Sequence, residues 1–127
     1  MPVDIKEAAN VLKSGWLALG SKTKGFEKVF SDYLGVKDVV LNSSCTAGMH
    51  VSLIAAGVVP GDEVITTPLS YVATSNAILY AGAKPVFVDV EPDTGLMDID
   101  KIEQAITKKT KAFLPVHLYG QMVDMKK

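Results

Sequence analysis

Residues 60–67 read Pro60-Gly61-Asp62-Glu63-Val64-Ile65-Thr66-Thr67. The proline and glycine favour a turn, and the β-branched residues that follow are typical of a strand. Apolar residues typical of helices lie on both sides of this stretch, from Ser44 to about Ala56 and from near Ser70 to Ala81. A strand between two helices is typical of a βαβ unit, so the sequence predicts a parallel sheet with crossover helices.

The alternation of strands and helices continues toward both ends of the chain. Val39-Val40-Leu41 predicts a short buried strand before the first of these helices, and Gly82 predicts the end of the second. Asp100-Lys101-Ile102-Glu103 has the spacing of a capped helix start. Two more strands are expected over residues 85–90 and 111–116. The predicted fold class is therefore α/β, with a mostly parallel sheet.

Two helices are predicted before this alternation begins. Asp4-Ile5-Lys6-Glu7 has the spacing of an N-terminal capping box, and Gly15 is a plausible end for the helix that it opens. A second helix with one apolar face is predicted to end at Gly35. Its apolar residues recur at three- and four-residue intervals: Phe26, Val29, Phe30, Tyr33 and Leu34.

The composition is that of a globular protein with no charged patch. Of 127 residues, 48% are hydrophobic and 21% are charged, and the formal net charge is -1. The longest cationic stretch, Lys108-Lys109-Thr110-Lys111, lies in a predicted polar turn, so no nucleic-acid partner is expected. All thirteen basic residues are lysine. Any bound anion must therefore be held by backbone N–H groups, hydroxyls or lysine.

The sequence gives no sign of an oxidising compartment or of a membrane. Cys45 is the only cysteine and cannot form an internal disulfide. The N-terminus lacks the pattern of a secretory signal, and no apolar stretch is long enough to span a bilayer. We therefore expect a cytoplasmic protein. The chain ends soon after its last predicted strand, and a parallel strand normally needs a covering helix, so the domain is expected to be incomplete.

Polar residues follow the predicted strands, at the edge where open α/β sheets bind ligands. The strongest signal is the turn Asn42-Ser43-Ser44-Cys45-Thr46, where a strand runs into small hydroxylated residues that open a helix. Free N–H groups at such a helix start suit a phosphate. Alternatively, Ser44 or Ser43 caps its own helix and binds nothing. Neither common glycine-rich phosphate motif is present, which disfavours an NTPase or a dinucleotide-dependent dehydrogenase.

Several segments closely resemble the sugar aminotransferases of the DegT/StrS type, in order and with the spacing of that family. They are Ser14–Gly20, Asn42–Ala47, Pro60–Ile65, Tyr71–Ile78, Gly82–Val90 and Pro115–Gln121. The resemblance implies a type I aminotransferase fold, a homodimer and pyridoxal phosphate as cofactor. It also implies transfer of an amino group, typically from glutamate, to a nucleotide-linked keto-sugar for surface polysaccharides or antibiotics.

The resemblance assigns cofactor-binding residues to this chain. Cys45, Thr46 and Ala47 match the family's small turn that holds the cofactor phosphate. The family often has glycine in place of Cys45, and we interpret this cysteine as a small filler rather than a nucleophile, because no cationic residue flanks it in the sequence. Tyr71 matches the aromatic residue that stacks on the pyridine ring; the alternative is a core tyrosine near a helix start.

Three further residues keep open roles. His117 ends the last predicted strand and lies near the family's active site, or it is a structural histidine bonded to a backbone carbonyl. His50 is interpreted as structural. Trp16 lies in the family's N-terminal segment near the active site, with core or dimer packing as the alternative.

The resemblance places the chemistry outside this chain. Residues 1–127 would form the N-terminal part of the pyridoxal-phosphate-binding large domain, without the C-terminal domain. The acidic residue that pairs with the pyridine nitrogen and the catalytic lysine would both come later. No catalytic residue and no metal ligand is therefore predicted here. Two alternatives depend on that lysine: a non-catalytic regulatory or binding protein, and a related sugar dehydratase with histidine in its place.

Overall fold

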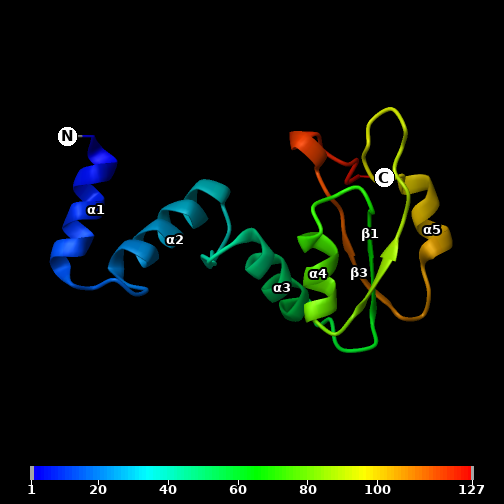
Figure 1. Cartoon of the computed structure of the whole chain (residues 1–127), viewed down its shortest axis with the longest axis horizontal. Helices are drawn as coiled ribbons and strands as arrows, with labels where there is room; N and C mark the ends of the chain where they lie inside the picture. The colour runs from blue at the N-terminus through cyan, green and yellow to red at the C-terminus, as the bar shows by residue number, and fades with distance from the viewer. Residues whose placement is uncertain (1, 127) are drawn as a thin grey trace. The chain divides into compact units, whose positions relative to one another are not determined.

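The structure is a computed structural model that describes residues 2–126. The chain forms two compact units, Met1–Leu41 and Asn42–Lys127, and each is described by itself (Figure 1). The first unit holds the helices α1 (Val3–Ser14) and α2 (Ser21–Leu34). No helix within residues 2–126 has the length and apolar character needed to cross a membrane.

Both predicted helix ends in the first unit are confirmed. Gly15 and Gly35 follow α1 and α2 with φ angles of 72° and 67°, a left-handed conformation that glycine adopts without a steric penalty. The predicted capping box is wrong, because α1 begins at Val3 after Pro2 and has no side-chain cap. Glu7 instead forms an ion pair with Lys22, and the hydrogen bond from Lys22 lowers the pKa of Glu7.

The second unit is an α/β structure with a parallel sheet, as predicted. Its three strands are arranged in the order β2-β1-β3, and both pairings are parallel. In chain order the elements are α3 (Cys45–Ala55), β1 (Glu63–Thr66), α4 (Ala73–Tyr80), β2 (Lys84–Phe87), the 3-10 helix η1 (Ile99–Lys101), α5 (Ile102–Ala105), β3 (Thr110–Leu114) and the 3-10 helix η2 (Leu118–Gly120).

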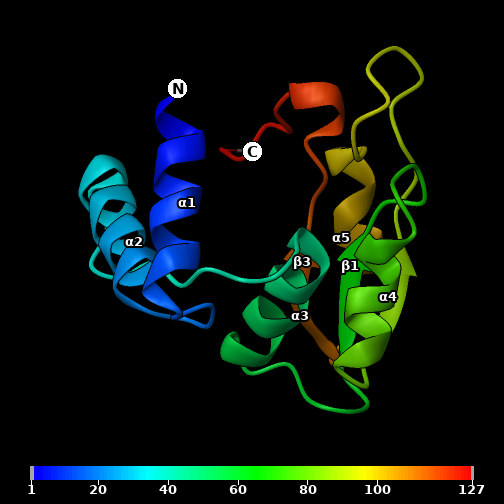
Figure 2. The same cartoon turned by 60° about the vertical axis from the view of Figure 1, so that its left-hand side comes forward.

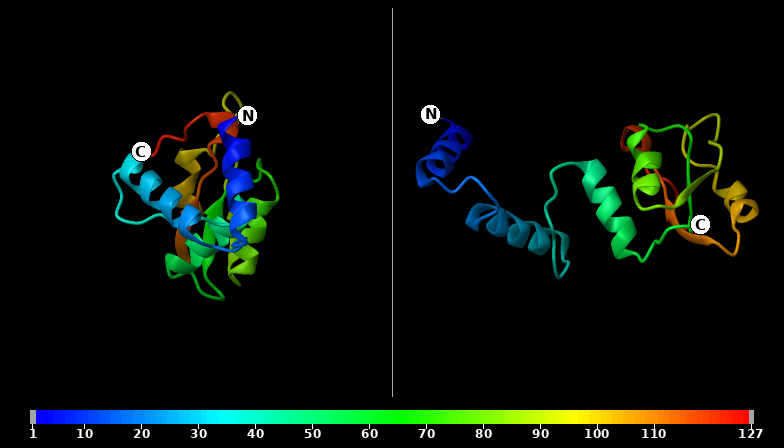
Figure 3. Two further views of the ribbon diagram at one scale, coloured as in Figure 1. Left: turned by 90° about the vertical axis from the view of Figure 1, so that its left-hand side faces the viewer. Right: turned by 60° about the horizontal axis from the view of Figure 1, so that its bottom comes forward.

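The central strand β1 is buried along its whole length and separates two apolar clusters. Val64 packs with residues of α3 and α4, such as Leu53 and Ile78, on one face of the sheet. Ile65 packs with Val88 and Met97 on the other face, which α5 covers. Figure 1 and the right-hand view of Figure 3 show α4 and α5 on opposite sides of the strands. This sandwich of helix, sheet and helix follows from the two-residue repeat of a strand.

The flanking strands are shorter than predicted because they end opposite the end of β1. Thr66 is the last residue of β1, and it pairs with Phe87 on one side and Leu114 on the other. Pro68 follows soon after and has no N–H group to continue the ladder. Residues 88–90 and 115–116 therefore lie outside the strands.

Two further predictions of local structure are wrong. The segment Val39-Val40-Leu41 is not a strand, and Val40 and Leu41 are exposed. A strand exists only where a neighbour pairs with it, and the sheet among the described residues consists of β1, β2 and β3. The helical turns near residue 100 begin with Asp98, whose side chain accepts a hydrogen bond from the Asp100 N–H, so Asp100 is not the cap.

Candidate functional site

Within the second unit, α3 and α4 end at the same edge of the sheet. Pro60, which follows α3, contacts Gly82, which follows α4: a Cβ atom on Gly82 would lie 2.9 Å from Pro60 Cγ. The Gly61 N–H also donates a hydrogen bond to the Gly82 carbonyl, with an N–O distance of 3.2 Å. The strands β1 and β2 begin just after these contacts. The N-terminal ends of both helices therefore lie toward the opposite edge, where the strands end (Figure 1).

The loops that follow the three strands meet at that carboxyl edge. A Cβ atom on Gly95, in the loop after β2, would lie 3.4 Å from Leu69 and 3.3 Å from Leu118. Those two leucines belong to the segments after β1 and β3. Gln121 Nε2 also donates to the carbonyl of Thr94, 3.0 Å away. Figure 2 shows the segments after β2 and β3 at the upper end of the sheet. The predicted convergence is confirmed for the loops after these three strands, whereas the turn at residues 42–46 does not follow a strand.

The start of α3 has one N–H group satisfied by its own cap. Ser44 is the N-cap, and its Oγ accepts a hydrogen bond from the Ala47 N–H over 3.1 Å. Ser44, and not Ser43, is therefore the cap of α3, and it satisfies this one N–H group. The N–H groups of Cys45 and Thr46 lie in the first turn, where a helix offers no internal acceptor. Of the three predicted phosphate-binding residues, these two have N–H groups directed out of the helix end.

The side chains around this helix start are small or exposed. Cys45 is exposed, and Thr46 and Ala47 are half-buried. At Gly48, in the first turn, an added Cβ atom would find its nearest neighbour, Asn42 Nδ2, at 3.8 Å. The helix start therefore lies at the surface of the second unit.

Tyr71 lies in the loop between β1 and α4, and its side chain is 80% exposed. Tyr71 therefore lies outside the core that the described residues form, and its stacking on a cofactor stays a prediction. The ring borders a pocket of about 180 Å³. The other residues of this pocket are Thr67, Pro68, Ser70, Val72, Thr74, Ser75 and Phe87. The loop after β1 thus presents an open aromatic face at the same sheet edge as the start of α3.

A pair of hydroxyl groups lies beside Tyr71, and the sequence alone did not single it out. Ser70 Oγ and Thr74 Oγ1 are 2.7 Å apart and share a hydrogen bond. Thr74 is buried in the first turn of α4. The sequence signal that could have revealed this pair is the spacing of four residues between Ser70 and Thr74 across a predicted helix start. Such a spacing brings two side chains onto one face of a helix.

The two histidines have structural contacts. His117 Nδ1 accepts a hydrogen bond from the Val123 N–H over 3.2 Å, so the predicted partner, a backbone carbonyl, is wrong. As an acceptor this nitrogen carries no proton, which leaves Nε2 as the protonated position of the neutral ring. His50 and Tyr80 form an edge-to-face ring contact between α3 and α4, with centroids 6.0 Å apart.

Trp16 belongs to the first unit, where its Nε1 donates to the Leu19 carbonyl over 3.1 Å. Its side chain is largely exposed, which excludes core packing within the described residues. A role near the active site or at a dimer interface stays a prediction.

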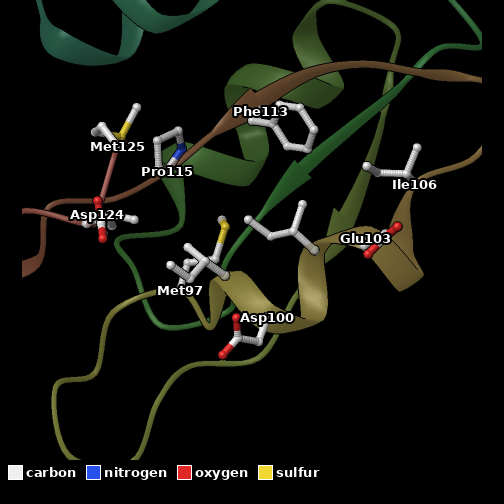
Figure 4. A pocket seen from close by; sticks show the side chains of 11 residues that line it. Met97, Asp100, Glu103, Ile106, Phe113, Pro115, Asp124 and Met125 are labelled. Carbon is white, nitrogen blue, oxygen red and sulfur yellow. The ribbon is translucent and has the colours of Figure 1, made fainter. Parts of the chain in front are cut away.

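A larger pocket of about 500 Å³ lies between α5 and β3 (Figure 4). Figure 4 shows apolar side chains such as Met97, Ile106 and Phe113 around it. The carboxylates of Asp100, in η1, and Glu103, in α5, also line this pocket. It contains none of the predicted cofactor residues and no cation to bind a phosphate. Among residues 2–126 no group of three or more acidic, histidine or cysteine side chains is placed to hold a metal ion.

Known proteins are similar to nearly the whole of this chain. The profile of the DegT/DnrJ/EryC1/StrS aminotransferase family matches residues 2–127. The spore coat polysaccharide biosynthesis protein SpsC of Bacillus subtilis is 47% identical over 122 residues. A UDP-4-amino-4-deoxy-L-arabinose–oxoglutarate aminotransferase of Shewanella sediminis is 45% identical over 122 residues. Each alignment covers 96% of this chain and 31% of the relative.

A solved structure has the same fold. The crystal structure of NtdA from Bacillus subtilis, with its cofactor PMP bound, superposes with a TM-score of 0.92 and 45% sequence identity. The superposition covers 96% of this chain and 28% of NtdA. The chain therefore spans about a third of the length of the relatives that it matches.

Proposed function

The chain belongs to the DegT/DnrJ/EryC1/StrS aminotransferase family, and we propose on that premise that it is the N-terminal part of the pyridoxal-phosphate-binding large domain of a longer enzyme. This full-length protein transfers an amino group, from glutamate, to the keto-sugar of a nucleotide-sugar. It acts as a homodimer in the cytoplasm. The oxoglutarate and UDP-sugar in the name of one relative and the spore coat polysaccharide in the name of another support this substrate class. The PMP bound to NtdA supports the cofactor.

The observation that carries this proposal is the shared position of an open helix start and an exposed aromatic ring at the carboxyl edge of one parallel sheet. The N–H groups of Cys45 and Thr46, with the Thr46 hydroxyl, are suited to hold a phosphate, and the dipole of α3 adds positive potential at that point. The chain has no arginine, so a phosphate bound by it must be held by N–H groups, hydroxyls or lysine, and this helix start supplies the first two. Ala47 contributes a small side chain, since its N–H group is already bonded to Ser44.

Tyr71 supplies the second half of the site. The face of its ring is open and forms a flat apolar wall that can orient a pyridine ring. When bound, pyridoxal phosphate supplies an electron sink for the transfer of the amino group. The residues of this chain bind and orient the cofactor. The lysine and the carboxylate that complete the chemistry belong to the remaining two thirds of the full-length protein.

The experiment that tests the proposal uses the full-length protein and three forms of residue 71. Pyridoxal phosphate is titrated against the wild type, Tyr71→Phe and Tyr71→Ala, and its dissociation constant is measured by absorbance. A stacked ring contributes roughly 0.5–1.5 kcal/mol beyond area burial, so Tyr71→Ala is expected to bind about two- to tenfold more weakly. Tyr71→Phe keeps the ring face and should stay within about twofold of the wild type. Equal dissociation constants for the two variants would contradict stacking.

An activity measurement separates this function from its two alternatives. The full-length protein is mixed with glutamate and a nucleotide-linked keto-sugar, and the formation of 2-oxoglutarate and amino-sugar is followed. Stoichiometric formation of both products supports the transferase. Cofactor binding without turnover would indicate a regulatory protein, and loss of water from the sugar without consumption of glutamate would indicate a dehydratase.

A further inference from the structure

We propose that Ser70 and Thr74 are positioning residues that hold Tyr71 in place for the cofactor ring, an inference that rests on the proposed function above. The hydroxyls of Ser70 and Thr74 share a hydrogen bond of 2.7 Å, and these residues lie on either side of Tyr71 in the chain. The Thr74 N–H also donates to the Tyr71 carbonyl over 3.0 Å. Thr74 is therefore bonded both to Ser70, the residue immediately before Tyr71, and to Tyr71 itself.

The residue after Tyr71 is held by the same helical turn. The carbonyl of Val72 accepts hydrogen bonds from the Asn76 N–H and from Ser75 Oγ, each over 3.0 Å. The backbone of the loop is thus attached to the first turn of α4 on both sides of Tyr71. Tyr71 itself is 80% exposed, so few neighbouring side chains fix its ring, and the position of the ring depends on where this backbone is held.

Helix capping does not account for the hydroxyl pair. The N-cap of α4 is Val72, and the helix has no side-chain cap bond. Ser70 Oγ bonds to the side chain of Thr74, not to one of the free N–H groups of the first turn. Thr74 is 6% exposed, and its β-branched side chain has few χ1 rotamers, which makes it a rigid anchor.

The benefit of such an anchor lies in the cost of ordering the loop. A mobile loop must lose conformational freedom when its aromatic ring meets a ligand, and that loss weakens binding. A loop that is already attached at Ser70 and Thr74 loses less. The pair should therefore strengthen cofactor binding through Tyr71, without touching the cofactor.

The test combines substitutions of the pair with substitution of Tyr71 in the full-length protein. Ser70→Ala and Thr74→Val are each expected to raise the dissociation constant of pyridoxal phosphate about threefold or more. In a Tyr71→Ala background the same substitutions should change it by less than about twofold, because the residue that they position is gone. Thr74→Ser keeps the hydroxyl and should restore most of the affinity. Ser31→Ala removes a buried serine hydrogen bond that does not involve this loop, and serves as the matched control.

A second measurement needs no cofactor. Amide hydrogen exchange at residues 69–72 of the cofactor-free protein should be faster in Ser70→Ala than in the wild type, and unchanged in Ser31→Ala. Equal weakening of cofactor binding with and without Tyr71 would overturn the inference, and so would unchanged exchange in the loop. If the unmodified protein binds no pyridoxal phosphate, the proposed function fails, while the exchange result still decides whether the pair holds the loop.

Discussion

Thr66 Oγ1 donates a hydrogen bond to the carbonyl oxygen of Leu114, and the two atoms are 2.8 Å apart. The two residues are also paired in the register of β1 and β3, where both strands end. The side chain of Thr66 is completely buried. This bond joins the central strand to its neighbour at the edge where the candidate site lies.

Thr66→Val should therefore destabilise the full-length protein. The valine fills nearly the same volume but leaves the Leu114 carbonyl without this donor, at a cost of about 1–3 kcal/mol. Thr66→Ser keeps the hydroxyl and is the control for the bond. Chemical denaturation of the three proteins measures the difference. Valine at least as stable as threonine would show that the bond contributes nothing.

Ser44→Ala should lower the stability by about 1 kcal/mol, because the Ala47 N–H loses its side-chain acceptor. Ser43→Ala leaves that bond in place and should stay within about 0.5 kcal/mol of the wild type. Ser44→Asp offers another good cap and should restore the loss. Thermal unfolding of the three variants checks the assignment, and an equal effect at both serines would contradict it.

Glu63 should make the stability depend on pH in the acidic range. The hydrogen bond from Thr107 is the main cause that lowers the pKa of Glu63 below its ordinary value of 4.5, and Lys84 adds to it. A lowered pKa in the folded state means that the carboxylate stabilises the fold above pH 4.5 and that this contribution disappears as the pH falls through the lowered value.

Denaturation curves at several pH values test this in wild type and Glu63→Gln. The difference between the two should be largest at neutral pH and should shrink as the pH falls below 4.5. Thr107→Val removes the largest cause and should reduce the pH dependence. A difference that does not vary with pH would show that Glu63 acts through packing alone.

Alanine in place of either of two glycines in the first unit should have different effects: one substitution should displace a neighbouring ring, and the other should stabilise its helix. A Cβ atom at Gly20 would lie 2.6 Å from Trp16 Cδ1, so Gly20→Ala must displace the indole ring. At Gly25, inside α2, an added Cβ atom meets nothing within 4 Å. Gly25→Ala should therefore stabilise the helix by roughly 0.5–1 kcal/mol.

Trp16 is the only tryptophan among residues 1–127, so the tryptophan fluorescence of this chain reports the position of that ring directly. The emission spectrum should change in Gly20→Ala and stay as in the wild type in Gly25→Ala. An unchanged spectrum in Gly20→Ala would mean that the ring does not occupy the position seen in the structure.

The sequence predicted those features of the fold that depend on local chemistry. Gly15 and Gly35 end their helices because the left-handed conformation favours glycine at a single position. The order of α3, β1, α4 and β2 followed from the change in apolar spacing along the chain. The prediction of a strand over residues 39–41 was wrong, because strand formation depends on a partner strand that the local sequence does not reveal.

The candidate site was predictable to the same extent. The position of Tyr71 after β1 followed from the alternation of elements, and its ring proved exposed at the expected edge. The contact between Ser70 and Thr74 was not predictable, because either hydroxyl could equally have capped α4 or faced water. Likewise, the partner of His117 depended on how the chain returns at Val123.

The register of the sheet also sets an order of events during folding. Glu63 of β1 and Lys84 of β2 are 21 residues apart, whereas Thr66 of β1 and the Leu114 of β3 to which it bonds are 48 residues apart. A ribosome adds about 5–20 residues each second, so β1, α4 and β2 have all left it a few seconds before β3 can join them. During that interval one side of β1 has no partner strand. The nascent chain is then most exposed to misassociation, and chaperones would be expected to bind it at this stage.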